Sequence, residues 1–112
     1  MSNLRISSHV DQSGTVVALS GELDISEANR VEEELRSIEQ QSPSVIVLDL
    51  RELTFLDSSG LRLVLEADLR AREAGRRLAI VPGPEAVHRV FLIALLDKRL
   101  NFVDDPASAT AS

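Results

Sequence analysis

The feature that most constrains the fold is a short, almost uninterrupted apolar run at residues 45–50. A strand that faces water on one side alternates apolar and polar residues, whereas a strand covered on both faces is apolar nearly throughout. Residues 78–81 form a second such run, and a helical pattern lies between the two. Strands joined through a helix pair in parallel by a right-handed crossover. The chain is therefore expected to be an α/β protein.

Three segments have the apolar spacing of helices that cover such a sheet. Each repeats an apolar residue every three or four positions, which places those residues along one side of a helix. The segments are residues 24–39, 57–75 and 84–95. Asp24 or Ser26 is a candidate N-cap for the first and Asp57 or Ser58 for the second, and Pro84 suits the first turn of the third.

The remaining segments complete the expected order β-β-α-β-α-β-α-β. Residues 4–20 have the pattern of a β-hairpin, and residues 100–103 read as a last edge strand. The expected fold is a small mixed sheet of four to five strands, with an N-terminal hairpin and helices packed on it in a doubly wound manner. Residues 51–56 are expected to form a connector, with Phe55 and Leu56 tucked into the core.

The chain is expected to form one domain and a short tail. Its 112 residues suffice for a single core, which we assign to residues 1–103. Residues 104–112 begin with acidic residues and then contain only Pro, Ala, Ser and Thr. This segment is expected to be a flexible C-terminal tail.

Composition excludes several classes of function. Twelve Lys and Arg against eighteen Asp and Glu give a net charge of −6, which disfavours a nucleic-acid partner. Cysteine is absent, which removes disulfides, thiol catalysis and the usual structural zinc sites. No apolar run approaches the ~20 residues of a membrane span, and no signal peptide is evident. A cytoplasmic protein without metal or cofactor is expected.

The most informative motif is LDSSGL at residues 56–61, where a buried strand is followed by a helix. Sites of α/β sheets form beyond the carboxyl ends of the strands, and a helix N-terminus favours phosphate. Ser58 or Ser59 is expected to be exposed there, and Gly60 would let another molecule's backbone come close. The alternative is that Asp57 and Ser58 are only helix caps.

A second acidic corner, GELD at residues 21–24, precedes the first helix. If both helix starts lie at one end of the sheet, Asp24 would lie near Ser58. Its carboxylate could then orient a serine hydroxyl or help to hold a partner's magnesium. The alternative role of Asp24 is to cap the first helix.

Catalysis is weakly supported. A small serine hydrolase would need a base, and only His9 and His88 are available, while the Gly-x-Ser-x-Gly pattern is missing. No phosphate-binding loop or metal-ligand spacing occurs. We expect no catalytic residues and no metal ligands.

The two motifs together resemble the STAS domain family. GELD at residues 21–24 is similar to the family's Gly-x-Leu-Asp signature. The apolar strand that ends in Asp-Leu at residues 49–50, followed by LDSSGL, is similar to its second signature. The resemblance covers about residues 4–103 and points to the stand-alone bacterial anti-sigma factor antagonists.

The resemblance implies a binding switch. In such antagonists the unphosphorylated form binds an anti-sigma factor that is also a serine kinase, and a sigma factor is released. The kinase then phosphorylates the first serine of the motif, here Ser58, and a serine phosphatase reverses the change. Asp24 and Asp57 would surround the acceptor serine. Ser59, Gly60 and Arg62 complete the expected site, with Arg62 one turn along as a partly neutralising charge.

A second role within the same family is a non-phosphorylated scaffold or complex subunit, since some STAS domains keep the motif without being phosphorylated. The chain also departs from the family pattern at its end. Such domains usually close with a further amphipathic helix, and residues 104–112 lack an apolar stripe to build one.

Overall fold

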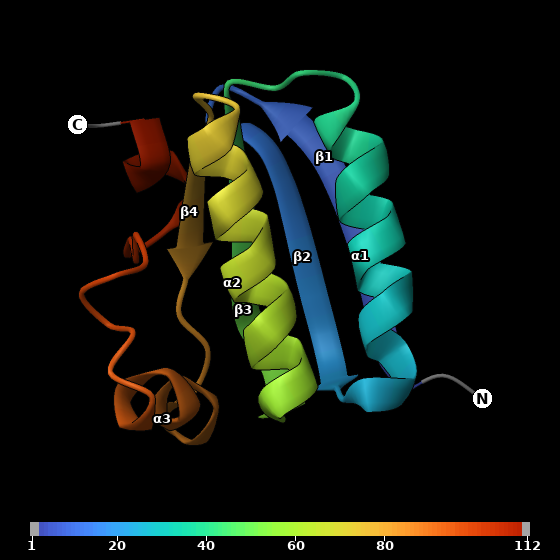
Figure 1. The fold of residues 1–112 in the computed structure, drawn as a ribbon, viewed down its shortest axis with the longest axis vertical. Helices are drawn as coiled ribbons and strands as arrows, with labels where there is room; N and C mark the ends of the chain where they lie inside the picture. The colour runs from blue at the N-terminus through green and yellow to red at the C-terminus, as the bar shows by residue number, and fades with distance from the viewer. Residues whose placement is uncertain (1–2, 111–112) are drawn as a thin grey trace.

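A computed structural model describes residues 3–110 of the chain (Figure 1). Its elements follow the expected order up to the third helix. The strands are β1 (Leu4–Asp11), β2 (Gly14–Leu23), β3 (Val45–Leu56) and β4 (Arg77–Val81), and the helices are α1 (Ile25–Glu39), α2 (Ser58–Glu73), α3 (Glu85–Ile93) and the 3-10 helix η1 (Pro106–Thr110). No helix within these residues is long and apolar enough to cross a membrane.

The four strands form one mixed sheet in the order β1-β2-β3-β4. β1 pairs antiparallel with β2, whereas β2, β3 and β4 run parallel, which confirms the expected hairpin and crossovers. Each crossover moves one strand further in the same direction, so right-handed connections place α1 and α2 on the same face. Both helices lie in front of the sheet (Figure 1). The expected doubly wound arrangement is therefore wrong, because strand order cannot be read from local patterns.

Residues 51–56 continue β3 and do not form the expected connector. They pair with the end of β2, from Ser20 beside Glu52 to Leu23 beside Leu56, with irregular register on the way. Leu56 is buried, but Phe55 is 46% exposed, so only one of the two enters the core. Neighbouring side chains of a strand point to opposite faces, which explains why both could not.

The core has two unequal parts. The larger lies between the sheet and the helices and includes Leu19, Leu35, Leu48 and Phe91. The smaller lies on the other face of the sheet, where short side chains of three strands meet Ala109 of η1; its strand members are Val16, Val47, Ala79 and Val81. One face of the sheet thus carries the long helices, and η1 covers part of the other face.

The end of the chain differs from expectation in two ways. The expected edge strand at residues 100–103 is reduced to a single bridge between Phe102 and Ile80. The segment expected to be flexible forms η1, in which Ala109 is packed: it is 1% exposed, and its carbonyl accepts a hydrogen bond from the Arg77 side chain at 2.7 Å. The apolar second face of the sheet supplies the reason for this packing. Residues 111–112 lie outside the described residues.

Candidate functional site

The starts of α1 and α2 lie together at the carboxyl edge of the sheet. β2 and β3 end side by side, with Leu23 paired to Leu56, and the N–H of Asp57 donates to the carbonyl of Leu23 at 3.3 Å. Each strand is followed directly by an aspartate that begins a helix, Asp24 for α1 and Asp57 for α2. The pairing brings GELD and LDSSGL to one corner, as the sequence prediction required.

Asp57 is the N-cap of α2 and also holds α1 in place. Its Oδ1 accepts hydrogen bonds from the N–H groups of Ser59 at 2.9 Å and Gly60 at 3.3 Å. Its Oδ2 accepts one from the N–H of Ile25 at 3.2 Å, at the first residue of α1. One carboxylate therefore satisfies free N–H groups of two helices. Of the two caps that the sequence left open, the structure uses Asp57.

Ser58 is left free because Asp57 does the capping. It is the first residue of α2 and is exposed, and its hydroxyl makes no hydrogen bond to any residue in the range 3–110. Ser59 is half-buried, and its backbone N–H is engaged by the cap. Of the two serines, Ser58 is therefore the more accessible to another protein.

The carboxylate of Asp24 accepts hydrogen bonds from the first turn of its own helix, α1. Its Oδ1 accepts hydrogen bonds from the N–H of Ser26 at 3.0 Å and from the Ser26 hydroxyl at 2.6 Å. These bonds, led by the one from the Ser26 side chain, lower the pKa of Asp24 below its ordinary value. Within residues 3–110 it makes no hydrogen bond to Ser58. The capping role is thus the one that the structure shows.

Gly60 faces the core, so the close approach of another molecule that we expected here does not fit. It is buried, and a Cβ at this position would lie 2.6 Å from Leu56 Cδ1 and 3.0 Å from Leu23 Cγ. Contacts this short cannot be accommodated without moving the core. The glycine lets α2 begin close against the ends of β2 and β3.

Arg62 lines a shallow hollow of about 220 Å³ between the starts of α1 and α2. The other lining residues are Ile25, Ala28, Asn29, Glu32, Ser59, Leu63 and Glu66. The guanidinium of Arg62 makes no ion pair with any residue between 3 and 110, although two glutamates share the hollow. It is an unengaged positive charge one turn along α2 from Ser58.

Two exposed apolar side chains that the sequence alone did not indicate belong to the segments next to this corner. Ile25 is 77% exposed at the start of α1, and Phe55 is 46% exposed near the end of β3. The alternation of a strand could have indicated Phe55, since its neighbour Leu56 is the one buried. Ile25 gave no such signal, because it continues the apolar spacing of α1. Both side chains leave apolar surface open to solvent.

The arrangement is suited to binding and not to serine hydrolysis. His9 is bonded to Asp11 at 3.1 Å, and His88 packs against Phe91 and Phe102. Neither imidazole is hydrogen-bonded to Ser58 or Ser59, so the serines lack a base. The described part of the chain contains no group of His, Cys, Asp and Glu that could hold a metal ion.

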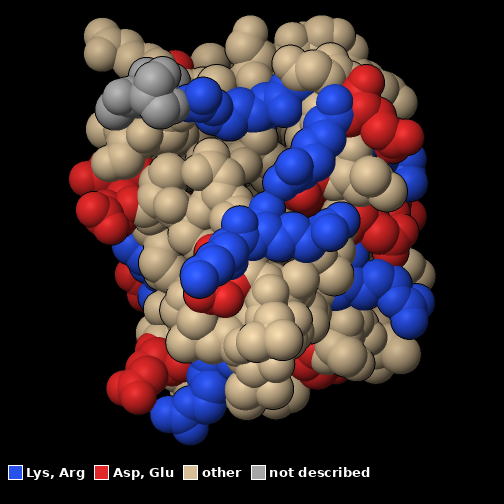
Figure 2. Space-filling view, turned by 60° about the vertical axis from the view of Figure 1, so that its left-hand side comes forward, with Lys and Arg blue, Asp and Glu red and all other residues tan. Residues whose placement is uncertain are grey.

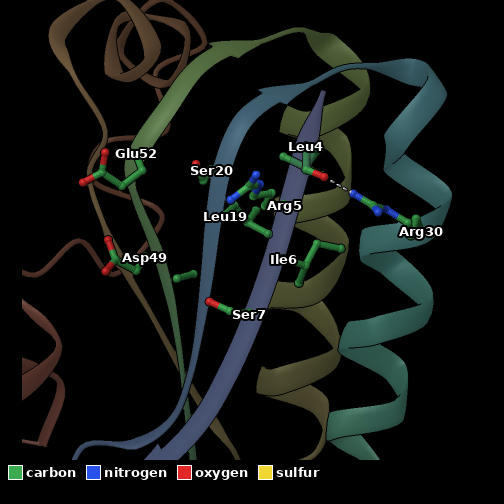
Figure 3. Close-up of a pocket in the computed structure, with 10 residues that line it drawn as sticks. Leu4, Arg5, Ile6, Ser7, Leu19, Ser20, Arg30, Asp49 and Glu52 are labelled. Atoms are coloured by element: carbon green, nitrogen blue, oxygen red, sulfur yellow. Dashed lines mark hydrogen bonds between the residues drawn. The ribbon is translucent and has the colours of Figure 1, made fainter. Parts of the chain in front are cut away.

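A larger hollow, of about 660 Å³, lies beside the edge strand β1 (Figure 3). Its charged side chains are partly engaged: Arg30 donates to the carbonyl of Leu4, and Asp49 accepts two bonds from the Arg51 guanidinium. Burial opposes ionisation of Asp49, but the bonds from Arg51 prevail and lower its pKa. Arg5 and Glu52 stand as single charges of opposite sign on different strands. No set of donors or acceptors converges in this hollow.

Comparison with known proteins places these features in a family. The family described as "Mlab, STAS domain" matches residues 6–104. An anti-sigma F factor antagonist of Paenibacillus polymyxa is 31% identical over 108 residues, which cover 96% of this chain and 92% of that protein. The osmosensory protein A of Mycobacterium tuberculosis is 29% identical over 86 residues, covering 77% of this chain and 54% of that protein. The first is named for antagonising a protein and not for catalysis, in agreement with the expectation of a non-enzyme.

Solved structures confirm the fold. An anti-sigma factor antagonist from Mycobacterium paratuberculosis superposes with a TM-score of 0.84 at 23% identity, covering 97% of this chain and 95% of that one. The antagonist SpoIIAA in its unphosphorylated form gives 0.77 at 20% identity, covering 93% and 92%. The phosphorylated form of SpoIIAA from Bacillus gives 0.70 at 22% identity, covering 94% and 95%. These likenesses extend over almost the whole chain and include the hairpin, the sheet and the helices.

Proposed function

The chain belongs to the STAS domain family, and from this we propose that it is an anti-sigma factor antagonist switched by phosphorylation of Ser58. In this proposal the unphosphorylated form binds an anti-sigma factor that is also a serine kinase, and a sigma factor is thereby released. Transfer of a phosphoryl group to Ser58 ends the complex. A serine phosphatase restores the binding form.

The observation that carries the proposal is the division of roles between Asp57 and Ser58. Asp57 caps α2, so the hydroxyl of Ser58 is free to react without uncapping the helix. A phosphate on Ser58 would lie at the N-terminus of α2, where free N–H groups and the helix dipole favour an anion. Fold stability should therefore change little on phosphorylation.

Binding should change much more than stability. A phosphate adds about −1.5 to −2 charges at pH 7. It would do so beside Asp57 and near the exposed apolar residue Ile25, on a surface that must lose water against a partner. Arg62 would offset only part of this charge. The same phosphate that the helix tolerates is thus unfavourable in a complex.

The relatives support the same proposal. The Paenibacillus protein, similar over nearly its whole length, is named as an antagonist of an anti-sigma factor. SpoIIAA, which shares the fold, has solved structures of both an unphosphorylated and a phosphorylated form.

Phosphate incorporation tests the proposal. The chain is incubated with ATP and each purified anti-sigma factor kinase of its host, and intact mass is measured. We expect one kinase to add a single phosphate to the wild type and to Ser59→Ala, the matched control, but none to Ser58→Ala. If no kinase modifies the chain, or if Ser58→Ala is modified as fast as wild type, a non-phosphorylated scaffold replaces this proposal.

A further inference from the structure

Helix α3 ends in a motif that normally contains glycine. The N–H of Leu96 donates to the carbonyl of Phe91 at 2.9 Å, and the N–H of Leu95 donates to that of Leu92 at 3.0 Å. This pair of bonds is the Schellman motif, whose C′ residue has left-handed backbone. That residue is Leu95, with a φ of 60°. Glycine adopts this conformation freely, whereas a leucine side chain crowds the backbone.

Burial of the Leu95 side chain does not offset the cost of its left-handed backbone conformation. Leu95 is 81% exposed, and its neighbours Ile93 and Leu92 are 75% and 44% exposed. We call these three residues the α3-end patch. Leu95 thus adds neither favourable backbone conformation nor core packing, so the stability of the fold does not account for it. An apolar side chain presented to solvent at a conformational cost indicates a contact residue.

The patch continues into a groove beside α2. Leu96, the residue after Leu95, lines a hollow of about 360 Å³ with Leu65, Glu66, Leu69 and Arg99. Leu69 is itself 52% exposed. Leu65 and Leu69 lie one turn apart on α2, so their side chains form a row along one wall. A row of this spacing fits the apolar stripe of another helix laid along the groove.

The rim of the groove carries three basic residues, Arg72, Lys98 and Arg99, against the exposed carboxylate of Asp97 and the lining residue Glu66, although the whole chain has a net charge of −6. Arg99 lines the groove and Lys98 precedes it, and neither side chain is hydrogen-bonded or ion-paired to another of residues 3–110. Arg72 reaches the same segment, where its guanidinium donates to the carbonyl of Arg99 at 2.7 Å and also pairs with Asp68. Figure 2 shows Lys and Arg side chains gathered across this side of the molecule. Glu66 is the carboxylate in the lining.

We propose that the groove and the α3-end patch bind an amphipathic helix of a protein partner, one with acidic residues flanking its apolar stripe. The apolar stripe would pack on Leu65, Leu69, Leu95 and Leu96, and the acidic flank would face Lys98 and Arg99. This goes beyond the proposed function, because it involves neither Ser58 nor phosphorylation.

Peptide titration of the full chain tests the inference. The probe is a short synthetic helix with leucines at positions i, i+3, i+4 and i+7 and glutamates elsewhere. Two matched peptides replace its glutamates by lysine or its leucines by serine. In spectra of ¹⁵N-labelled protein we expect the acidic peptide to shift the amide signals of Leu65, Leu69, Leu96 and Arg99. The other two peptides should bind about tenfold more weakly or not at all.

Variants of the protein sharpen the test. Leu95→Gly relieves the strained backbone, so we expect a higher melting temperature together with about fivefold weaker binding of the acidic peptide. Arg99→Glu should weaken that binding about tenfold. Val10→Ser and Arg5→Glu are the matched controls, since Val10 is 76% exposed and Arg5 is also unpaired among residues 3–110. Both controls should bind the peptide as wild type does.

Three results would overturn the inference. The first is that the acidic peptide shifts none of the four groove signals, or that Leu95→Gly binds it unchanged. The second is a concentration-dependent dimer in sedimentation that Leu95→Gly disperses, which would make the patch a self-interface. The third is weaker peptide binding by Ser58→Glu, which would make the groove part of the Ser58 corner. Failure of Ser58 to accept phosphate would leave the inference standing.

Discussion

Neighbouring residues at the start of α2 differ in whether they pack against the core or face solvent. Gly60 serves the core, because a Cβ there would meet Leu56 Cδ1 at 2.6 Å and Leu23 Cγ at 3.0 Å. We expect Gly60→Ala to lower the free energy of unfolding by about 1–3 kcal/mol, and Gly60→Val by more. Urea denaturation measures this, with Ser59→Ala as the neighbouring control. Unchanged stability of Gly60→Ala would show that the corner can relax.

The contribution of Asp24 to the stability of the fold should depend on pH in a defined direction. Its pKa is lowered in the folded protein, chiefly by the hydrogen bond from the Ser26 side chain, so its stabilising effect is present above the ordinary carboxyl pKa of 3.8. That effect disappears as the pH falls through the lowered pKa of the folded state. We expect the stability difference between wild type and Asp24→Ala to shrink as the pH is lowered from about 6 to about 3. A difference that stays constant over this range would mean that the charge of Asp24 does not stabilise the fold.

The roles of these residues could be predicted from the sequence only where they depend on near neighbours in the chain. Asp24 and Asp57 could be predicted as caps because capping depends on a few neighbouring residues. The inward orientation of Gly60 could not, since it depends on Leu23 and Leu56 being brought together by strand pairing. The free hydroxyl of Ser58 could be predicted only as one of two possibilities, until the cap was assigned to Asp57.

At the scale of elements, Asp57 joins two helices to the sheet, and its removal should affect more than one cap. We expect Asp57→Ala to cost about 1 kcal/mol for the lost cap of α2, and more because the N–H of Ile25 also loses its acceptor. Ser58→Ala is the matched control and should change stability by less than about 0.5 kcal/mol. Chemical denaturation of the two variants measures these losses of stability. Equal losses in the two variants would mean that Ser58 shares the capping.

Element boundaries were predictable where the pattern was strong and local. The helical stripes and the two apolar strands fell where expected, because periodicity reports the covered side of each element. Residues 51–56 read as a connector because charged and polar residues interrupt them, yet pairing with β2 extends β3 to Leu56. Likewise, Ala109 of η1 packs on the second face of the sheet. The small residues of this segment gave no indication of that packing.

For the whole molecule, we propose that two exposed apolar residues belong to the surface that binds the partner. Ile25 and Phe55 are 77% and 46% exposed, so their replacement should not disturb the core. We expect Ile25→Ser and Phe55→Ser each to weaken binding of the anti-sigma partner about tenfold, with the melting temperature nearly unchanged. Val10→Ser, on the edge strand, is the control and should bind normally. Normal binding by both variants would place the interface elsewhere.

The family could be recognised from the sequence, whereas the arrangement of the molecule could not. Two short motifs, GELD and LDSSGL, were enough for the resemblance that the family match later confirmed. That α1 and α2 share one face follows from the strand order β1-β2-β3-β4, which no single segment encodes. The corner formed by the starts of α1 and α2 depends on that order, because it joins residues more than thirty positions apart, as the bond from Ile25 to Asp57 shows.

The proposed switch is tested by the affinity of the anti-sigma partner for the chain before and after phosphorylation of Ser58. Calorimetric titration should show phosphorylation weakening binding by about a hundredfold or more, while the melting temperature of the free chain hardly changes. Ser58→Ala should bind as tightly as the unphosphorylated protein, and Ser58→Glu should be intermediate, since a carboxylate carries less charge than a phosphate. The electrostatic switch would be contradicted if the phosphorylated protein and Ser58→Glu both bound the partner as tightly as Ser58→Ala does.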